Sequence, residues 1–331
     1  MTLKLAINGF GRIGRNTLRG LVESGRTDIE IVAINDLGPV ETNAHLLEFD
    51  TVHGRFPGTV TTAEDMIDVG RGPIRVTAIR DPADLPWSDI DVVLECTGIF
   101  TDRDKAAAHL KNGAKRVLVS APSKGADRTV VYGVNHGDLT AEDMIVSNAS
   151  CTTNALAPLA RLLDDAFGII SGQMTTVHCY TGSQPTVDKP RKALERSRAA
   201  GLSMVPTTTS AQDQTGLVLP ALKNRIEARA IRVPTASVSC IDLTVQTRDI
   251  VTAGAVNEML HDAARSHHWL GWTEAPLVSS DLRGRPESLI VSGPQTSVSV
   301  GGLLRVFGWY DNESGFSCRM LDMALRVGRR R

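Results

Sequence analysis

One cysteine of this chain occupies a position that favours nucleophilic chemistry. Cys151 lies in the stretch SNASCTTN, residues 147–154, between an apolar run and a long helical pattern. Ser150 is a suitable N-cap residue, which would place Cys151 in the first turn of a helix. A helix N-terminus stabilises a thiolate and lowers the cysteine pKa. The alternative is a small buried apolar residue, the usual role of a free cysteine, and position alone does not decide between the two.

A cysteine nucleophile needs a base, and His178 is a candidate. It directly follows the apolar run Met174–Val177. A histidine within reach of the thiol could take its proton, and we expect the pair to lower the thiol pKa as an ion pair. The alternative is a structural histidine, which is the commoner role at a strand end. Spacing alone cannot bring His178 to Cys151, since only the fold can do so.

A glycine-rich turn indicates a nucleotide site. Residues 9–14 read GFGRIG, which matches G-x-G-x-x-G, directly after the apolar run Leu3–Asn8 and at the start of a helical pattern. Glycines let the backbone approach a pyrophosphate, and the helix N-terminus offers free N–H groups. Asp36 follows the second apolar run and could bind an adenine ribose while repelling the extra phosphate of NADP. A plain strand–turn–helix with Asp36 as a turn or cap residue is the alternative.

The elements that must position these residues differ between the two halves of the chain. The first half alternates apolar runs with helical patterns, which is typical of a parallel sheet buried on both faces. The runs are Leu3–Asn8, Ile29–Ile34, Ile74–Ala78, Asp91–Cys96, Arg116–Ser120 and Met144–Ser147, with helical patterns at Arg12–Glu23 and Glu41–Glu48. This half predicts an α/β domain of the Rossmann type, with a doubly wound, mostly parallel sheet.

The second half predicts an α+β domain with a mostly antiparallel sheet. Strand-like runs lie close together at Gln173–Cys179, Ala228–Val233, Val238–Thr247, Ser288–Val291 and Leu303–Trp309. Only two long helical patterns interrupt them, near Thr152–Phe167 and Ala255–Arg265. A last helical pattern follows at Gly315–Val327.

Composition limits the class of protein. The 331 residues suit two domains, and 42% hydrophobic with 22% charged residues is an ordinary globular balance. A net charge of −1 argues against a dedicated nucleic-acid binder. No apolar run approaches the ~20 residues of a membrane span, and the N-terminus lacks the pattern of a signal peptide. Five cysteines without a C-x-x-C pair argue against disulfides or structural zinc and favour a reducing, cytoplasmic setting.

Six stretches in a fixed order make the chain recognisable. They are INGFGRIGR, NDL, SNASCTTN, the H-x-Y-T-G stretch at His178–Gly182, RVPT at Arg232–Thr235 and WYDNE at Trp309–Glu313. Together they resemble phosphorylating glyceraldehyde-3-phosphate dehydrogenase of the bacterial, NAD-dependent type. The resemblance runs from about Leu3 to about Ala324, and the S-C-T-T-N block with the downstream H-x-Y-T is its most specific part.

The resemblance implies a reaction and a set of site residues. Glyceraldehyde 3-phosphate would be oxidised to 1,3-bisphosphoglycerate with NAD and inorganic phosphate, through a thioester on Cys151, with His178 as base. Positions that match the cofactor site are Gly9, Gly11, Arg12, Ile13, Gly14, Asp36, Arg80, Thr97, Gly98, Ser120, Pro190 and Asn312. Positions that match the substrate phosphate are Thr181 and Arg232, and those that match the inorganic phosphate are Ser150, Thr152, Arg196, Thr209 and Ser210. No metal is implied.

The resemblance also implies an organisation and a setting. Residues 1–150 would form an NAD-binding domain, residues 151–314 a catalytic domain, and residues 315–331 a helix that packs back on the NAD-binding domain. Members of the family are homotetramers, so we expect a cytoplasmic homotetramer without a membrane or nucleic-acid partner.

Some positions depart from the family pattern: Ser183, Lys189, Ser210, Ser314 and Phe316. Ser210 stands where glycine is usual, and glycine adopts positive φ at little cost, so we expect a strained serine and weaker binding of inorganic phosphate. Two alternative functions stay open. Erythrose-4-phosphate dehydrogenases tend to lose the threonine that stands here as Thr181. A diverged NAD-binding regulatory protein would not need the intact Cys151 and His178.

Overall fold

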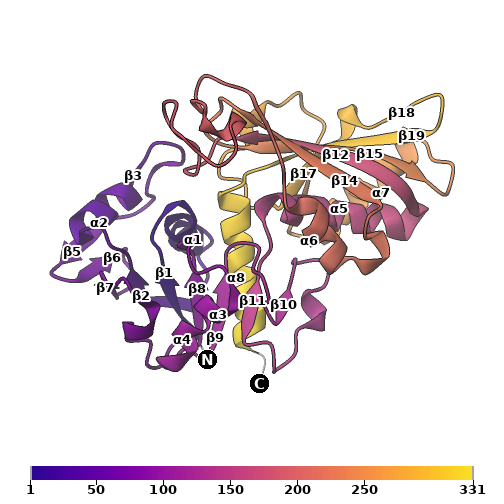
Figure 1. The fold of residues 1–331 in the computed structure, drawn as a ribbon. Coiled ribbons are helices and arrows are strands. Elements are labelled where there is room, and N and C mark those ends of the chain that lie inside the picture. The colour runs from indigo at the N-terminus through magenta and orange to yellow at the C-terminus, as the bar shows by residue number, and fades with distance from the viewer. Residues whose placement is uncertain (1, 330–331) are drawn as a thin grey trace. The chain divides into compact units, whose positions relative to one another are not determined.

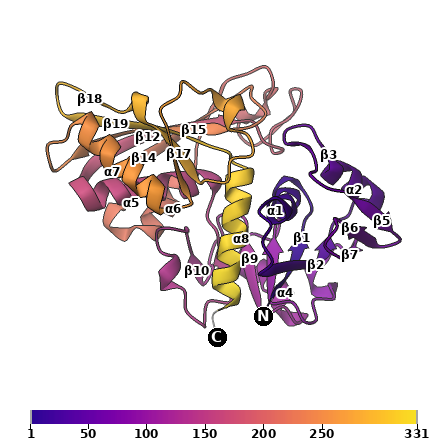
Figure 2. The ribbon, with the colours of Figure 1, turned by 180° about the vertical axis from the view of Figure 1, so that it is seen from behind.

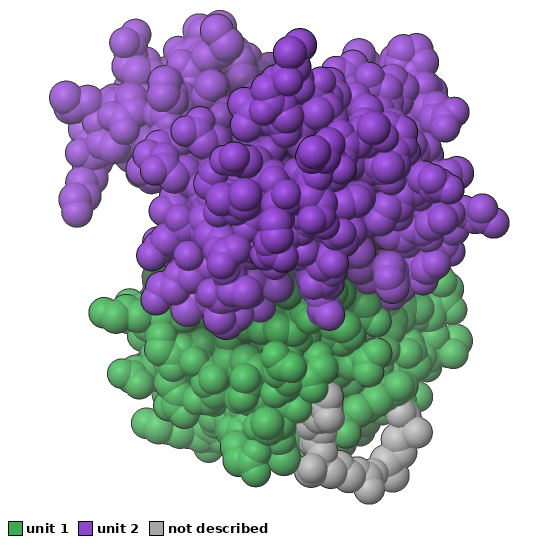
Figure 3. Space-filling view, turned by 90° about the vertical axis from the view of Figure 1, so that its right-hand side faces the viewer, with its two compact units in different colours: residues 1–149, 317–331 green, residues 150–316 purple. Residues whose placement is uncertain are grey.

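The computed structural model describes residues 2–329, which form two compact units (Figures 1 and 3). Unit 1 takes residues 2–149 and 317–329, and unit 2 takes Ser150–Phe316. Across the described residues, no helix has both the length and the apolar character that crossing a membrane requires.

Unit 1 is built on a nine-stranded sheet of order β10-β11-β9-β8-β1-β2-β7-β6-β5. All pairs from β10 to β7 are parallel, and only β5, β6 and β7 pair in antiparallel fashion. The strands are β1 (Leu3–Asn8), β2 (Ile29–Asn35), β5 (Thr61–Ala63), β6 (Met66–Asp68), β7 (Pro73–Thr77), β8 (Val92–Glu95), β9 (Arg116–Val119), β10 (Arg128–Thr129) and β11 (Ile145–Ser147). A separate hairpin joins β3 (Phe49–Asp50) and β4 (Gly54–Arg55).

The central strands of unit 1 are buried on both faces, as their continuous apolar sequences predict. All four residues of β8 and of β9 are buried, and so are five of the six residues of β1. The helices are α1 (Arg12–Glu23), α2 (Val40–Glu48), α3 (Arg103–Ala106) and α4 (Ala108–Lys111). The mostly parallel sheet is confirmed, whereas the antiparallel edge β5–β6 was not predicted, because these strands are three residues long and mostly exposed.

Unit 2 is built on an eight-stranded sheet of order β13-β14-β12-β15-β19-β17-β16, with β18 paired to β19. The pairs β12–β14 and β16–β17 are parallel and the other pairs are antiparallel. The strands are β12 (Ile169–Cys179), β13 (Val205–Thr207), β14 (Ile226–Val233), β15 (Ser239–Thr247), β16 (Leu270–Thr273), β17 (Leu289–Ser292), β18 (Ser297–Val298) and β19 (Leu303–Tyr310). The α+β domain with a mostly antiparallel sheet is thus confirmed.

One face of the unit 2 sheet carries the helices α5 (Cys151–Phe167), α6 (Ala211–Val218) and α7 (Ala253–Ser266), as Figures 1 and 2 show from opposite sides. Alternation along β12 decides which side chains meet them, since Met174, Thr176 and His178 are buried while Gln173 is exposed. Helix α5 begins where the sequence predicts it. Helix α6 was not predicted, because its eight residues show little apolar periodicity.

Helix α8 (Ser314–Gly328) begins in unit 2 and continues into unit 1. Two glycines show how its unit 1 part packs. A Cβ added at Gly20 of α1 would come within 3.7 Å of the Cys318 sulfur, and one added at Gly328 would collide with the Leu3 side chain. The helix therefore lies against α1 and β1, and a glycine at each contact allows the close approach.

Candidate active site and nucleotide-binding edge

The N-terminus of α5 presents Cys151. Ser150 is the N-cap, and its Oγ accepts a hydrogen bond from the Thr153 backbone N–H at 3.1 Å. Ala149, the residue before this cap, has φ of +54°, a left-handed conformation that non-glycine residues seldom adopt. Cys151 is half-buried in the first helical turn, as the sequence predicts.

The end of β12 brings His178 to this cysteine. Its Nε2 lies 3.5 Å from the Cys151 Sγ, and the ring is only 4% exposed. Its Nδ1 lies 2.7 Å from the carbonyl oxygen of Cys179. Nε2 is therefore the ring nitrogen that faces the thiol and can exchange a proton with it. The fold thus supplies the pairing that spacing could not.

Arg232 completes the group, because β12 and β14 pair in parallel with His178 directly beside Arg232. Its Nη1 donates to the Cys179 carbonyl at 3.0 Å and lies 2.8 Å from His178 Nδ1. A guanidinium can only donate, so this second contact is a hydrogen bond when Nδ1 carries a lone pair, and in either tautomer it places a fixed positive charge beside the imidazole.

The environment opposes ionisation of both partners. Burial raises the pKa of the Cys151 thiol, and Arg232 and nearby hydrogen-bond donors offset this only in part. Burial and then the Arg232 charge lower the pKa of His178 to about 3. Both shifts favour a neutral thiol beside a neutral imidazole. The resting ion pair expected from the sequence is therefore disfavoured, because low exposure outweighs the charges that would support it.

Tyr310, at the end of β19, supports the site and was missed by the sequence reasoning. Its hydroxyl lies 2.9 Å from Thr152 Oγ1 and 2.8 Å from Thr176 Oγ1, and its ring meets the His178 ring edge-on at 5.9 Å. The tyrosine is 1% exposed, and burial raises its pKa. It lies in the WYDNE stretch, whose sequence carries no local signal of these long-range contacts.

Asn312, two residues further on, is oriented by its neighbours. Its Oδ1 accepts from the Cys179 thiol at 3.0 Å and from the Ser239 hydroxyl at 3.3 Å. The side-chain amide therefore presents Nδ2, its donor end, away from these contacts. Asp311 fixes the backbone that follows, because its Oδ1 accepts from the N–H groups of Glu313 and Ser314 at 2.9 Å.

The loop after β12 forms a cavity of about 570 Å³ in which two sequence-predicted anion ligands meet. Arg196 and Arg232 both line it, together with Ser183 and Thr207. Arg196 Nε donates to Thr207 Oγ1 at 2.6 Å, and Thr181 Oγ1 lies 3.0 Å from Ser183 Oγ. The sequence assigned Arg196 and Arg232 to two different phosphates, yet their side chains share this one cavity.

Ser210 corrects an expectation. It is the N-cap of α6, with φ of −77° and ψ of −3°, which any L-residue adopts without strain. The preceding Thr209 instead supplies the capping contact, since its Oγ1 accepts from Ala211 N–H at 3.2 Å. The expected backbone strain at Ser210 is wrong, because the missed helix α6 begins at this residue.

In unit 1, the glycine-rich turn fits a dinucleotide. Gly9 has φ of +93°, and a Cβ at Gly14 would lie 2.3 Å from the Gly9 carbonyl oxygen, so both positions require glycine. A Cβ at Gly11, the N-cap of α1, would meet nothing within 4 Å. The first turn of α1 thus adjoins open space, and helix N–H groups beside open space suit a pyrophosphate.

Asp36 ties this turn to the end of β2. Its carboxylate accepts from the N–H groups of Phe10 and Gly38, each at 2.9 Å. Arg12 is held by an ion pair with Asp50. Burial raises the Asp50 pKa, but Arg12 and two backbone N–H groups outweigh it and lower the pKa to about 2.

The remaining sequence-predicted cofactor positions lie in both units. Thr97 and Gly98 follow β8, Ser120 follows β9, and exposed Arg80 lies beyond β7, all in unit 1. Ile13 lies in the first turn of α1 and accepts from Thr17 Oγ1 through its carbonyl oxygen. Pro190 is exposed on the loop after β12 in unit 2. Among the described residues, no group of three or more His, Cys, Asp or Glu side chains is arranged to hold a metal ion.

Comparisons with known proteins cover both units. The family model for the glyceraldehyde 3-phosphate dehydrogenase NAD binding domain matches residues 3–103, and that for the C-terminal domain matches residues 150–312. The chain is 61% identical to the glyceraldehyde-3-phosphate dehydrogenase of Cereibacter sphaeroides, over 99% of both chains. It is 60% identical to the enzyme of that name from Xanthobacter flavus over 99% of both chains, and 51% identical to that from Pseudomonas aeruginosa over 99% of this chain and 98% of the relative.

Proposed function

The chain belongs to the glyceraldehyde-3-phosphate dehydrogenase family, and we propose that it oxidises D-glyceraldehyde 3-phosphate with NAD and inorganic phosphate to 1,3-bisphosphoglycerate. The observation that carries this proposal is the half-buried Cys151 at a helix N-terminus, with Nε2 of His178 3.5 Å from its sulfur. The names of the relatives favour this activity over erythrose-4-phosphate dehydrogenase and over a regulatory NAD-binding protein.

Cys151 and His178 would share the covalent steps. The Cys151 sulfur bonds to the aldehyde carbon while its proton moves to His178 Nε2, which gives a thiohemiacetal once that proton reaches the oxygen. His178 then removes the hydroxyl proton as the carbon loses hydride and becomes a thioester. Bound NAD supplies the hydride acceptor. An oxygen of inorganic phosphate attacks the thioester, the carbon–sulfur bond breaks, and the acyl phosphate leaves Cys151 as a thiolate that regains a proton.

Arg232 would couple substrate binding to the base. We assign the substrate phosphate to Thr181 and Arg232, because a guanidinium beside hydroxyl groups suits a dianion. The Arg232 charge lowers the pKa of His178, so a phosphate paired with Arg232 would offset that charge and make the imidazole a stronger base. His178 would then be most basic when substrate is present.

The second phosphate is assigned to the N-termini of α5 and α6. Ser150 and Thr209 cap these helices, and helix N-termini favour anions. Ser210 offers an exposed hydroxyl there, whereas the Thr152 hydroxyl is engaged with Tyr310 at 2.9 Å. Arg196 would supply charge from the neighbouring cavity. We retain all five residues as the proposed inorganic-phosphate ligands.

Unit 1 residues would hold the cofactor. The N–H groups after Gly11 would bind the pyrophosphate, with Gly9, Arg12, Ile13 and Gly14 shaping that turn. Asp36 would accept from the adenine ribose, and the Nδ2 group of Asn312 would donate to the nicotinamide carboxamide. The other positions assigned to the cofactor are Arg80, Thr97, Gly98, Ser120 and Pro190. The open space at Gly11 and the orientation of Asn312 support these assignments.

We further propose a homotetramer that works in the cytoplasm. The face of the unit 2 sheet opposite α5 has a cavity of about 800 Å³ lined by β12, β14, β15 and β19 side chains, and Leu303 at its rim is 48% exposed. A second copy of the chain would cover this face. Sedimentation should therefore report four times the 35.6 kDa chain mass. A monomer at micromolar concentration would contradict the tetramer.

The activity is tested by following NADH formation with glyceraldehyde 3-phosphate, NAD and inorganic phosphate. We expect turnover that requires all three, with erythrose 4-phosphate a much poorer substrate. Equal or better kcat/KM for erythrose 4-phosphate would favour the alternative dehydrogenase. NAD binding without turnover of either aldehyde would favour the regulatory protein.

A further inference from the structure

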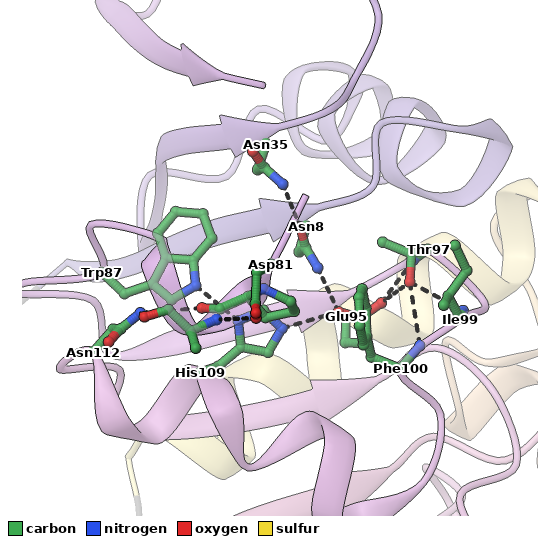
Figure 4. Close-up of polar contacts among 12 residues, drawn as sticks. Asn8, Asn35, Asp81, Trp87, Glu95, Thr97, Ile99, Phe100, His109 and Asn112 are labelled. Atoms are coloured by element: carbon green, nitrogen blue, oxygen red, sulfur yellow. Dashed lines mark hydrogen bonds and ion pairs between the residues drawn. The ribbon is translucent and has the colours of Figure 1, made fainter. Parts of the chain in front are cut away.

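Unit 1 contains a buried carboxyl group that the reaction does not use. Glu95, the last residue of β8, is 1% exposed, and among the described residues it forms no ion pair with lysine or arginine. Its Oε2 accepts from Asn8 Nδ2 at 2.6 Å and lies 2.9 Å from His109 Nε2. Its Oε1 accepts from the Thr97 backbone N–H at 2.9 Å and from the Thr97 hydroxyl (Figure 4).

The hydrogen-bond pattern fixes the direction of the contact between His109 and Glu95. The indole N–H of Trp87 donates to His109 Nδ1 at 2.8 Å, and an indole nitrogen can only donate. The proton of His109 is therefore on Nε2 and points at Glu95. Two hydrogen-bond partners meet each carboxyl oxygen. Glu95 is a buried carboxyl group held entirely by hydrogen bonds.

From Glu95 a relay of side-chain amides crosses the sheet. Asn8 Oδ1 accepts from Asn35 Nδ2 at 2.8 Å, and Asn35 Oδ1 accepts from the Ile79 N–H and the Thr77 hydroxyl, each at 2.9 Å. The four strands β8, β1, β2 and β7 are neighbours in the sheet, and all these residues lie at or just beyond their carboxyl ends. The Ile79 N–H can only donate, so it fixes the orientation of the Asn35 amide and through it that of Asn8, whose Nδ2 points at Glu95.

Three relay residues adjoin residues that the proposed function assigns to NAD. Asn8 precedes Gly9, Asn35 precedes Asp36, and Ile79 precedes Arg80. Thr97 is itself such a residue, and its hydroxyl, after donating to Glu95, accepts from the Ile99 N–H at 3.0 Å. A Cβ at Gly9 would lie 2.7 Å from the Thr97 nitrogen, so the glycine turn rests directly on this segment.

We propose that Glu95 is a positioning residue for NAD. Its two oxygens align Asn8, Asn35 and Thr97 through these hydrogen bonds and thereby set the spacing between the glycine turn, the Asp36 carboxylate and the 97–100 turn. The proposal rests on the proposed placement of NAD at this edge. Glu95 need not touch the cofactor, because it acts through the backbone segments that do.

Glu95→Gln tests the charge without changing the shape. The glutamine NH₂ must face either the Thr97 N–H or the Asn8 and His109 donors, so at least one donor loses its acceptor. If Asn8 turns over to accept, Asn35 must follow, and its NH₂ group then opposes the Ile79 N–H. We expect the Kd for NAD, measured by calorimetry, to rise about tenfold, the scale of one lost charged hydrogen bond.

Two further readouts separate positioning from general damage. Trp87→Phe changes the same buried cluster at a point more distant from Glu95. Trp87 is 0% exposed, and it is connected to Glu95 only through its hydrogen bond to His109. It should leave the NAD Kd within about twofold of wild type. The rate of Cys151 alkylation without NAD, a property of unit 2, should be unchanged in both variants. An unchanged NAD Kd in Glu95→Gln, or an equal rise in Trp87→Phe, would overturn the proposal.

A matched pair covers the case in which Glu95→Gln does not fold. Thr97→Val removes the hydroxyl that links Glu95 to the 97–100 turn, while Thr97→Ser keeps it. We expect weaker NAD binding by several-fold in Thr97→Val alone, and equal Kd values in the two variants would overturn the relay. A wild-type chain that binds no NAD would instead refute the proposed cofactor site.

Discussion

The two units hold their functional groups in different ways. At the nucleotide edge of unit 1, the carboxyl group of Glu95 is buried and has four hydrogen-bond partners before any ligand binds. In unit 2, burial shifts the pKa values of Cys151 and His178 toward the neutral forms. The comparison indicates that the binding edge is preorganised, whereas the reactive pair ionises only as the reaction proceeds.

The largest expected effect is on turnover and comes from removing the nucleophile of unit 2. Cys151→Ala should lower kcat by more than about 10⁴-fold, because loss of a nucleophile in a coupled pair has effects on that order. NAD binding, measured by calorimetry, should be retained. Cys240→Ala, at a buried β15 cysteine outside the reactive pair, is the matched control and should keep most activity. Substantial turnover by Cys151→Ala would show that another group carries the acyl intermediate.

Removing the base should have the next largest effect. His178→Asn is expected to lower kcat by about 10²–10⁴-fold, the usual contribution of a positioned acid–base group. The exposed His267 serves as control, and His267→Asn should leave kcat unchanged. Steady-state kinetics with saturating substrates provides the measurement.

The pH dependence of Cys151 alkylation gives a second test of His178 as the base. Because burial raises the pKa of Cys151, iodoacetamide labelling should accelerate as the pH rises above 7. Labelling by His178→Asn should be slower at neutral pH, since the base is absent. A wild-type rate that is already maximal at pH 6 would show that the resting pair is ionised.

Substitution of Asp36 tests the proposed cofactor site in unit 1 and should have a smaller effect than loss of Cys151 or His178. Asp36→Asn keeps an acceptor for the Phe10 N–H, which the aspartate now binds at 2.9 Å, but removes the charge that would face the 2′-phosphate of NADP. The ratio of kcat/KM values for NAD and NADP should fall about tenfold, as expected for one like-charge repulsion. Equal kcat/KM for both cofactors in the wild type would contradict the role of Asp36.

The smallest effect is expected at Ser210. With φ of −77° and no side-chain capping bond, this serine has no strain for glycine to relieve, and Ser→Gly at an N-cap costs only a few tenths of a kcal/mol. Ser210→Gly should therefore change the KM for inorganic phosphate by less than about twofold. Ser210→Ala tests separately whether the Ser210 hydroxyl contributes to the KM for inorganic phosphate. A several-fold drop in the KM for inorganic phosphate in Ser210→Gly would instead support the backbone strain that the sequence suggested.

The units also differ in how much the sequence could predict. The glycine turn and Asp36 were predictable, because a nucleotide motif is contiguous and each parallel strand is an unbroken apolar run. The Cys151–His178–Arg232 group depends on the β12–β14 register, and those residues lie 27 and 54 positions apart. Only the resemblance to a family could join them before the structure did.

What sequence reasoning missed has physical causes. Tyr310 and Glu95 carry no local signal, because an aromatic or acidic residue at a strand end is common and its value lies in long-range contacts. Helix α6 is short and weakly amphipathic, and missing it led directly to the wrong conformation at Ser210. The neutral state of Cys151 depends on its degree of burial, which a helix N-cap signal does not reveal.

The most direct test of the central claim is to trap the covalent intermediate. Enzyme is mixed with glyceraldehyde 3-phosphate and NAD in phosphate-free buffer, quenched in acid and digested for mass spectrometry. We expect the acyl group on the peptide that contains Cys151, and its loss when inorganic phosphate is added before the quench. Acylation of any of the other four cysteines, or no acylated peptide despite NADH formation, would contradict the assignment of Cys151 as the nucleophile.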